Sequence, residues 1–228
     1  MHLELPKVRL ESFKDFAKHY LMIVLSILTA LGLEAWIEHA HHSHAAGEAS
    51  RRMDEELAQV IDAIGRSTAI NQNELVTLRS LDAMVTSALA AGVDGSEINR
   101  RIHARSTDYQ LNANWPTLST VAWDVAVADQ SAGWIDAGAL QRYSEAYTAE
   151  RELGTWLQHD STLVLDAPHL VDTLTSLQTG HPLDPYGFLL SLRQMEMMLA
   201  SEISHLQSTA RRIAPAVHVA GAAGAGSA

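Results

Sequence analysis

Residues 20–33 read YLMIVLSILTALGL, fourteen residues without a charged side chain. Extended to residues 17–37, the run has about 21 residues, which as a helix measures about 30 Å. That length matches the hydrocarbon core of a bilayer. Lys18 and Glu34 are the charges inside the extension, and each lies near one of its ends, where a charged side chain can reach the interface. The stretch therefore predicts a transmembrane helix over residues 17–37.

Two other interpretations of this run stay open. Its length also suits the central region of a cleavable signal peptide, although the acidic and bulky residues 34–38 make a poor cleavage region. The uncharged part is shorter than the usual span, so a buried core helix is the other alternative. Tyr20 and Trp36 lie near the two ends of the run, where amphipathic rings prefer the membrane interface. They favour the membrane anchor.

The charges divide the chain into two parts at the apolar run. All three lysines and one arginine precede it, whereas the 12 arginines after residue 37 are outnumbered by 23 acidic residues. No Lys or Arg follows the span until Arg51. The positive-inside rule then predicts a cytoplasmic N-terminus over residues 1–16 and an extracytoplasmic domain. In a bacterium with two membranes, the protein would lie in the inner membrane with its C-terminal domain in the periplasm.

The composition removes several classes of function. The chain has no cysteine, which excludes a disulfide framework, a thiolate metal site and a cysteine nucleophile. A net charge of −11 argues against a nucleic-acid partner, because such binding depends on neutralising phosphates. No phosphate-binding loop or nucleophile-elbow motif is present. We therefore expect a protein without enzymatic activity.

Helical periodicity continues beyond the span. From residue 45 to residue 91, apolar side chains recur at three- and four-residue spacing, with a polar interruption at residues 71–73. Nothing between Trp36 and Glu48 forces a break, so this helix and the anchor can form one continuous rod that ends before Gly92. The expected core face comprises Met53, Leu57, Val60, Ile61, Ile64, Leu75, Leu78, Leu81, Val85 and Leu89.

The remainder predicts an all-α fold, in which an antiparallel helical bundle over residues 38–215 follows the transmembrane helix. Turn and capping residues divide it into further helices. We expect them at residues 94–105, at 117–130 with Pro116 before it and Gly133 at its end, after Asp136, from Pro168 to 177, and from Pro185 to Pro215. Residues 216–228 are small and repetitive, which predicts a disordered tail.

Aromatic side chains are concentrated in the second half of the chain. At helical spacing they are more often core than part of a ligand-binding box. We therefore expect a core role for Trp115, Trp123, Trp134, Tyr143, Tyr147 and Trp156.

Three local patterns carry a resemblance to a group of proteins. They are ALGLEAWIE at residues 30–38, the next helix with EEL at 55–57, and TVAWD at 120–124 followed by WID at 134–136 and LQRYSEAY at 140–147. In this order the chain resembles a broad group of uncharacterised bacterial single-span membrane proteins with a helical extracytoplasmic domain. The resemblance implies the architecture and no activity.

A histidine collar lies at the exit of the span, made of Glu34, Glu38, His39, His41, His42 and His44. On a helix Glu38 shares a face with His41 or His42, and Glu38 and His41 have the E-x-x-H spacing of metal sites in helical bundles. Imidazole and carboxylate ligands suit zinc or copper, so Glu38, His41 and His42 are the candidate metal ligands. A chance polar cluster above the membrane and a pH-sensitive collar are the alternatives.

These observations predict a membrane-anchored envelope protein that acts as a non-enzymatic interaction or scaffold protein, or as an accessory subunit. Its expected partners are the lipid bilayer, through residues 17–37, and another protein or a second copy of the chain. The alternative is a ligand- or metal-responsive periplasmic sensor module that uses the histidine collar.

Overall fold

The computed structural model describes residues 13–110, 113–165 and 168–217. Within these ranges the chain is all-α and forms no strand, as the sequence predicts. The elements are α1 (Phe13–Ala90), α2 (Gly95–Ala104), the 3-10 helix η1 (Ser106–Asp108), α3 (Val121–Ala128), the 3-10 helix η2 (Ser131–Trp134), α4 (Ala137–Leu165), α5 (Pro168–Thr179) and α6 (Pro185–Val217).

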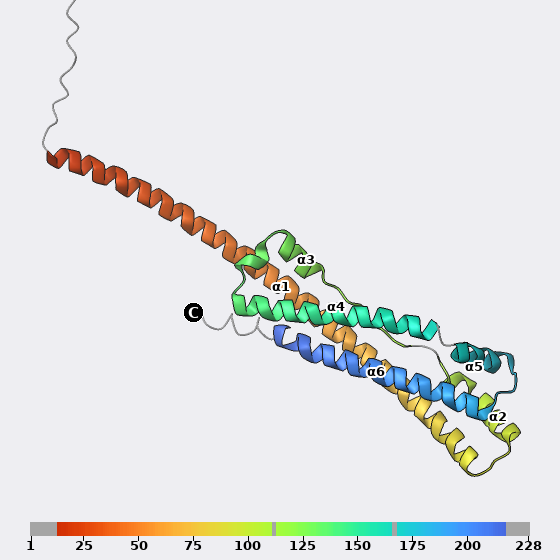
Figure 1. Ribbon diagram of the computed structural model, residues 1–228. Helices are drawn as coiled ribbons and strands as arrows, with labels where there is room; N and C mark the ends of the chain where they lie inside the picture. Colours follow the sequence, from red (N-terminus) through yellow and green to blue (C-terminus); the bar gives the residue numbers. More distant parts are fainter. Residues whose placement is uncertain (1–12, 111–112, 166–167, 218–228) are drawn as a thin grey trace, which may run out of the picture.

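α1 is one unbroken helix of 78 residues that contains both the apolar run and the first long helix of the bundle. The prediction of a continuous rod is confirmed, and the expected end of the span at residue 37 lies within this helix and stays a prediction. Figure 1 shows the N-terminal part of α1 projecting alone from the bundle. In the described part of the chain, α1 is the one helix long and apolar enough to cross a membrane.

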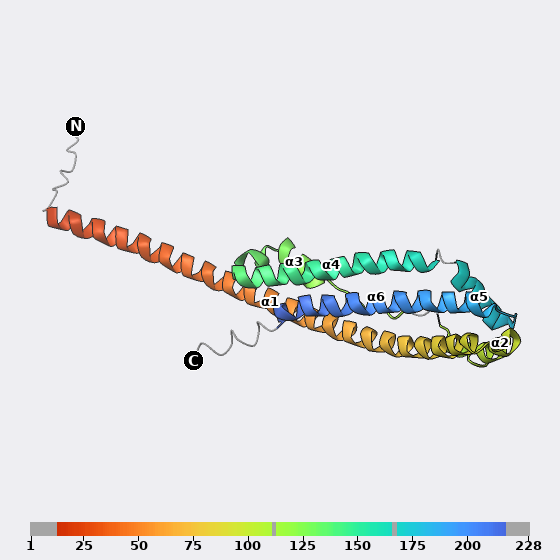
Figure 2. The same ribbon diagram turned by 60° about the horizontal axis from the view of Figure 1, so that its bottom comes forward.

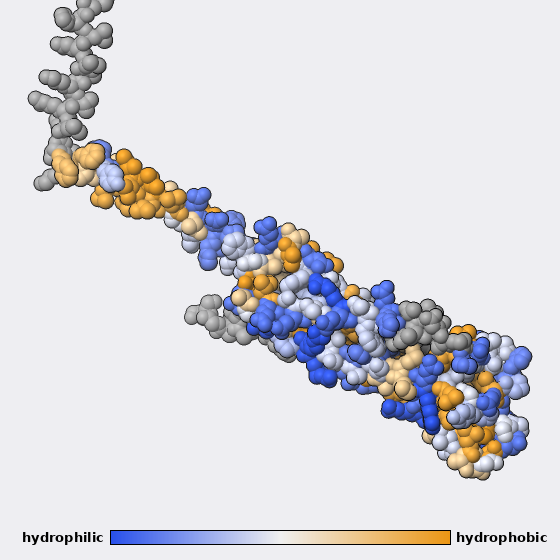
Figure 3. Space-filling view, viewed as in Figure 1, coloured by the Kyte–Doolittle hydropathy of each residue, from blue (hydrophilic) through white to orange (hydrophobic). Residues whose placement is uncertain are grey.

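The apolar run of α1 is exposed on all sides. None of the most apolar window of the helix is buried against other described elements, so this run is not a core helix of the chain. Figure 3 shows hydrophobic side chains around the projecting end of α1, followed by a hydrophilic collar where the helix nears the bundle. A helix that is apolar all round is typical of a membrane span or of a helix buried by other protein.

Three long helices, α1, α4 and α6, form the bundle. α6 packs along both α1 and α4. Figures 1 and 2 show that α1 and α4 run away from the projecting end and that α6 returns antiparallel to them. α2 and α5 lie at the far end of the bundle, and α3 and η2 lie at the end nearest the projecting helix.

Two hydrophobic cores follow one another along α1. The core nearer the projecting end joins α1 to α3, η2, α4 and the second half of α6, and the far core joins it to α2, α5 and the first half of α6. Most of the predicted core face of α1 is confirmed, with Ile61 and Leu89 only partly buried. The fully buried members are Met53, Leu57, Val60, Ile64, Leu75, Leu78, Leu81 and Val85.

A polar layer separates the two cores on α1. Asn71, which the sequence shows only as part of a polar interruption, is 0% exposed. Its Nδ2 donates to the backbone carbonyl of Asn114 and to Oε1 of Glu202, both at 3.0 Å. Its Oδ1 accepts from the backbone N–H of Asn114 at 2.8 Å. One side-chain amide therefore satisfies both backbone groups of a residue that lies outside any helix.

The predicted turn and cap residues largely take their expected places. Gly92 follows α1 with a φ of +65°, a left-handed conformation that glycine adopts without strain. The side chains of Asp94, Asp136 and Asp184 accept hydrogen bonds from backbone N–H groups in the first turns of α2, α4 and α6. These carboxylates satisfy donors that a helix start leaves free.

Three predicted boundaries are wrong. α3 begins at Val121 rather than at 117, because the backbone before it is bound by side chains of α1 and α4 instead of by its own helix. It ends at Ala128, and the left-handed residue after it is Gln130, not Gly133. α6 continues past Pro215 to Val217, so residues 216 and 217 are not part of a tail; residues 218–228 lie outside the described ranges.

We expect Asn71→Ala to lower the free energy of unfolding of the detergent-solubilised chain by about 2–4 kcal/mol. The change removes three hydrogen bonds of buried or partly buried groups at once. Chemical denaturation measures the effect. The matched control is Asn73→Ala on the exposed side of the same turn, which should change stability by no more than about 0.5 kcal/mol. Equal losses in the two variants would show that the polar layer is not what Asn71 stabilises.

Candidate functional site

A non-helical return segment, residues 113–120, leads the chain back along α1 toward α3. It contacts α1 at Asn71 through Asn114 and at Glu56 through Ser119. These two α1 positions are about 22 Å apart along the helix axis, and five residues of chain span at most about 18 Å, so the contacting side chains bridge the remainder. The segment must therefore be almost fully extended, which explains why Pro116 lies within it and not in a helical turn.

Glu56 of α1 holds the end of the return segment and the start of α3. Its carboxylate accepts the Ser119 hydroxyl at 2.7 Å and the Ala122 backbone N–H at 3.0 Å. The hydroxyl of Tyr147 on α4 donates to the same carboxylate at 2.9 Å. A carboxylate beside the first turn of a helix is favourable, because the N–H groups there have no partner within the helix.

Glu150 of α4 completes this arrangement. It is 0% exposed, and its Oε1 accepts the Ser119 backbone N–H at 2.6 Å. Burial and the nearby Glu56 carboxylate raise the pKa of Glu150 from 4.5 to about 7, while the bond from Ser119 acts in the opposite direction. Burial and hydrogen bonding to Glu56 also raise the pKa of Tyr147. Ser119 thus bridges two acidic side chains from two different helices.

The exposed side of α3 and the neighbouring turns of α1 enclose a groove. Two hollows that share Arg52, Ala122 and Val125 make up this α1–α3 groove, the larger with a volume of about 530 Å³. Val121 and Val125 of α3 are exposed along it, Val121 by 64%. Figure 3 shows hydrophobic side chains gathered over α3. The groove combines apolar side chains with arginines and carboxylates and can accept a side chain or short segment of another protein.

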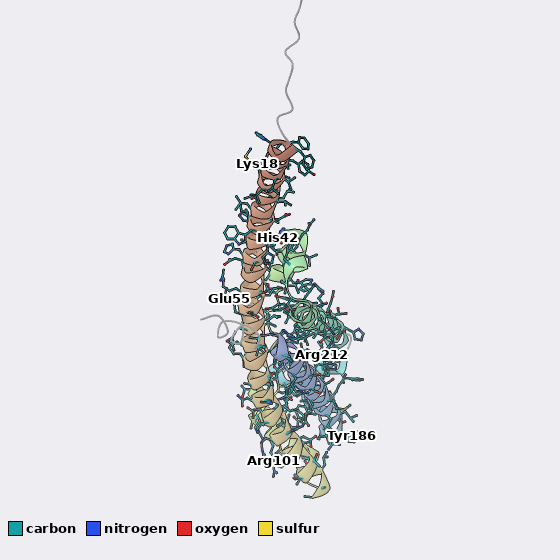
Figure 4. The ribbon with its side chains drawn as sticks, turned by 90° about the vertical axis from the view of Figure 1, so that its left-hand side faces the viewer. Lys18, His42, Glu55, Arg101, Tyr186 and Arg212 are labelled. Atoms are coloured by element: carbon teal, nitrogen blue, oxygen red, sulfur yellow. The ribbon has the colours of Figure 1, made fainter. Side chains whose placement is uncertain are left out.

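The histidine collar lies on the part of α1 that leaves the bundle. Nε2 of His42 is 3.6 Å from Oε1 of Glu38, one turn away. The ring of His42 stacks on Trp134 of η2, with the ring centroids 3.5 Å apart. His41 instead lines a shallow hollow on α1 together with Glu34 and Glu38. Figure 4 shows His42 at the level where the short elements lie beside α1.

The metal assignment stays a prediction. Among the described residues, no group of three or more His, Cys, Asp or Glu side chains is arranged to hold a metal ion. The structure brings Glu38 close to His42, and it places His41 with Glu38 in the hollow on the open surface of α1.

The aromatic prediction is confirmed in part. Tyr143 and Tyr147 are buried, and Trp123 and Trp156 pack against the core nearer the span. The prediction is wrong for Trp115 and Trp134, which are 43% and 54% exposed. Both of these residues lie outside the α-helices, where helical spacing says nothing about which side faces the core.

Sequence reasoning missed Asn71 and the acidic pair, Glu56 and Glu150, that binds Ser119. A signal was present in each case, because Glu56 lies three residues after the core residue Met53, and Glu150 lies three residues after Tyr147. A carboxylate in the register of a buried helix face requires a partner, but periodicity does not identify that partner.

Comparisons with known proteins give no relative. No family model matches the chain, and neither a curated protein nor a solved structure matches it. The resemblance to a group of bacterial membrane proteins therefore stays a prediction, and the function must be argued from the geometry alone.

The raised pKa of Glu150 makes stability depend on pH. Because the folded chain binds this proton more tightly than the unfolded chain, the contribution of Glu150 is fully present below about pH 4.5 and is lost as the pH rises through about 7. Glu150→Gln keeps an acceptor for Ser119 and removes the titration. At a pH above 7 we expect the variant to be more stable than the parent chain by about 1–3 kcal/mol.

Denaturation of the detergent-solubilised chain across this pH range measures the difference. Glu145→Gln, on the exposed face of the same helix, is the control and should keep the pH dependence of the parent. Parallel pH profiles for the parent and Glu150→Gln would contradict the prediction.

Proposed function

We propose that the chain is a single-span membrane protein whose helical domain is a non-enzymatic interaction or scaffold module, or an accessory subunit of a membrane complex. The observation that carries the proposal is the continuity of α1, which passes from the exposed apolar run into both cores of the bundle. An unbroken helix gives the domain a set height and orientation relative to its anchor. Such a connection suits a protein that presents a surface to partners.

The proposed location is the inner membrane of a bacterium, with residues 17–37 in the bilayer. The N-terminus is cytoplasmic and the bundle is periplasmic. The distribution of lysine before the span and acidic residues after it supports this orientation. The bundle begins to bury α1 at Ala49. The intervening residues 38–48 form a stalk of about 17 Å, and Ala90 lies about 80 Å from the end of the span.

The α1–α3 groove is the surface that we propose for a protein partner or a second copy of the chain. It lies at the end of the bundle that is nearest the span. Exposed valines on α3 supply apolar contact area, and Arg52 and Arg66 on α1 supply donors for carboxylates. The acidic pair beneath α3 supports a structural role rather than a chemical one, because it bonds to the protein's own backbone.

A metal- or ligand-responsive sensor is the alternative function. The pair formed by Glu38 and His42 favours it, because a ligand held there would also contact η2 through Trp134. His41, the third predicted ligand, lies in the hollow on the exposed side of α1 and would have to bind the metal from there.

A reporter fused after Ala228 tests the placement. We expect activity from a reporter that works only in the periplasm, and no activity from one that works only in the cytoplasm. The mass of the membrane-extracted chain should also include residues 17–37. A cytoplasmic signal, or a chain shortened at its N-terminus, would overturn the proposed arrangement.

Photo-crosslinking in intact cells tests the interaction. A photoreactive amino acid at Val125 should give a discrete adduct, and one at Val121 should give the same adduct, because both side chains line the groove. Adduct mass distinguishes a second copy from another protein. The matched control is Leu190 on α6, which is 54% exposed but lies outside the groove, and it should give no such adduct. No adduct at either valine, or the same pattern at all three sites, would refute the assignment of the groove.

A further inference from the structure

η2 is a charge-free element next to the stalk. Residues 130–135 contain no Asp, Glu, Lys or Arg. The two flanking carboxylates are exposed and bond to adjacent backbone, because Asp129 accepts the Ser131 N–H and Asp136 accepts N–H groups of the first turn of α4. Between them Trp134 remains 54% exposed, although one face of its ring is covered by His42. A tryptophan ring that stays half exposed on an element without charged residues indicates a contact with something other than this chain.

The height of Trp134 follows from α1. His42 is five residues beyond Ile37, the expected end of the span, and α1 is unbroken between them. The stacked rings therefore lie about 7.5 Å above the hydrocarbon core. The headgroup layer is about 5–8 Å thick on each side of a bilayer. Trp134 is thus at the level of the headgroups, where tryptophan is enriched in membrane proteins.

We propose that η2 is a second membrane contact, in which Trp134 enters the phospholipid headgroup layer. This contact holds the bundle against the membrane that α1 crosses. The inference rests on the proposed single span, because the span sets the height of η2. The occupant is the lipid interface and not another protein, because the proposed span places Trp134 at the height of the headgroups. The stack of His42 on Trp134 ties η2 to the stalk, so the bundle has two points of attachment to the bilayer.

The contact can be tested with single cysteines, because the chain contains none of its own. Gly133, Gly65 and Gly32 are exposed, and a Cβ added at each meets no atom within 4 Å. Gly133 adjoins Trp134, Gly65 lies on α1 about 42 Å above the span, and Gly32 lies inside it. Each cysteine variant of the full chain carries a fluorophore and is reconstituted in phosphatidylcholine vesicles that contain nitroxide-labelled lipid.

We expect a headgroup nitroxide to quench the label at Gly133 about threefold more than the label at Gly65. Trp134→Ala should reduce the quenching at Gly133, and Trp134→Tyr should retain it, because tyrosine also prefers the interface. Equal quenching at Gly133 and Gly65 would overturn the inference. A Gly133 cysteine that instead joins two copies by a disulfide would also overturn it, since a second chain would then cover η2.

The label at Gly32 separates the inference from the proposed function. Strong quenching there by an acyl-chain nitroxide shows that the span is inserted. If the Gly32 label is quenched and the Gly133 label is not, the result supports the proposed span and refutes the lipid contact of η2. If the Gly32 label is not quenched, the proposed span itself fails.

Discussion

The arrangement of the structure depends on α1, one unbroken helix that has an exposed apolar part and a part that packs in the bundle. Over residues 20–33, α1 is apolar all round, and from Ala49 onward it buries a single face in the bundle. Because a straight α-helix advances about 1.5 Å per residue, this continuity sets the height of every bundle element above the proposed span. The other long helices, the two cores and the stalk are all arranged along this axis. A break near Gly47 would leave the cores intact and remove the relation between the domain and its anchor.

The return segment shows how the bundle orders a part of the chain that has no helical bonds of its own. Asn71 satisfies the backbone of Asn114, Glu150 satisfies Ser119, and Glu56 receives the first turn of α3. A carboxylate removed from water is costly unless it is bonded, and the partners of Glu150 and Glu56 include the backbone donors of Ser119 and Ala122. The short α3 lies where these side chains hold it, and its position creates the α1–α3 groove.

The proposed functional surfaces lie at the same end of the bundle. The α1–α3 groove, η2 and the histidine collar all lie near the projecting part of α1, whereas α2 and α5 form the far end. The α1 residues that line the groove, from His44 to Arg66, lie about 10–43 Å beyond the end of the proposed span. Lipid contact at Trp134 and partner contact at α3 would act on neighbouring elements, since η2 packs against both α1 and α3.

Patterns within single helices were sufficient to predict the all-α class, the apolar run, the continuous rod and most of the core face of α1. They depend on spacing and on the polarity of nearby residues, which the chain carries locally. The roles of Asn71, Glu56 and Glu150 depended on residues that are 31 to 131 positions away in their hydrogen bonds. Helix packing alone also determines the exposure of Trp134, the residue at which α3 begins and the formation of the groove. A hydrogen bond between distant segments leaves no periodic trace in the sequence, so tertiary packing alone decides which buried polar group meets which backbone donor.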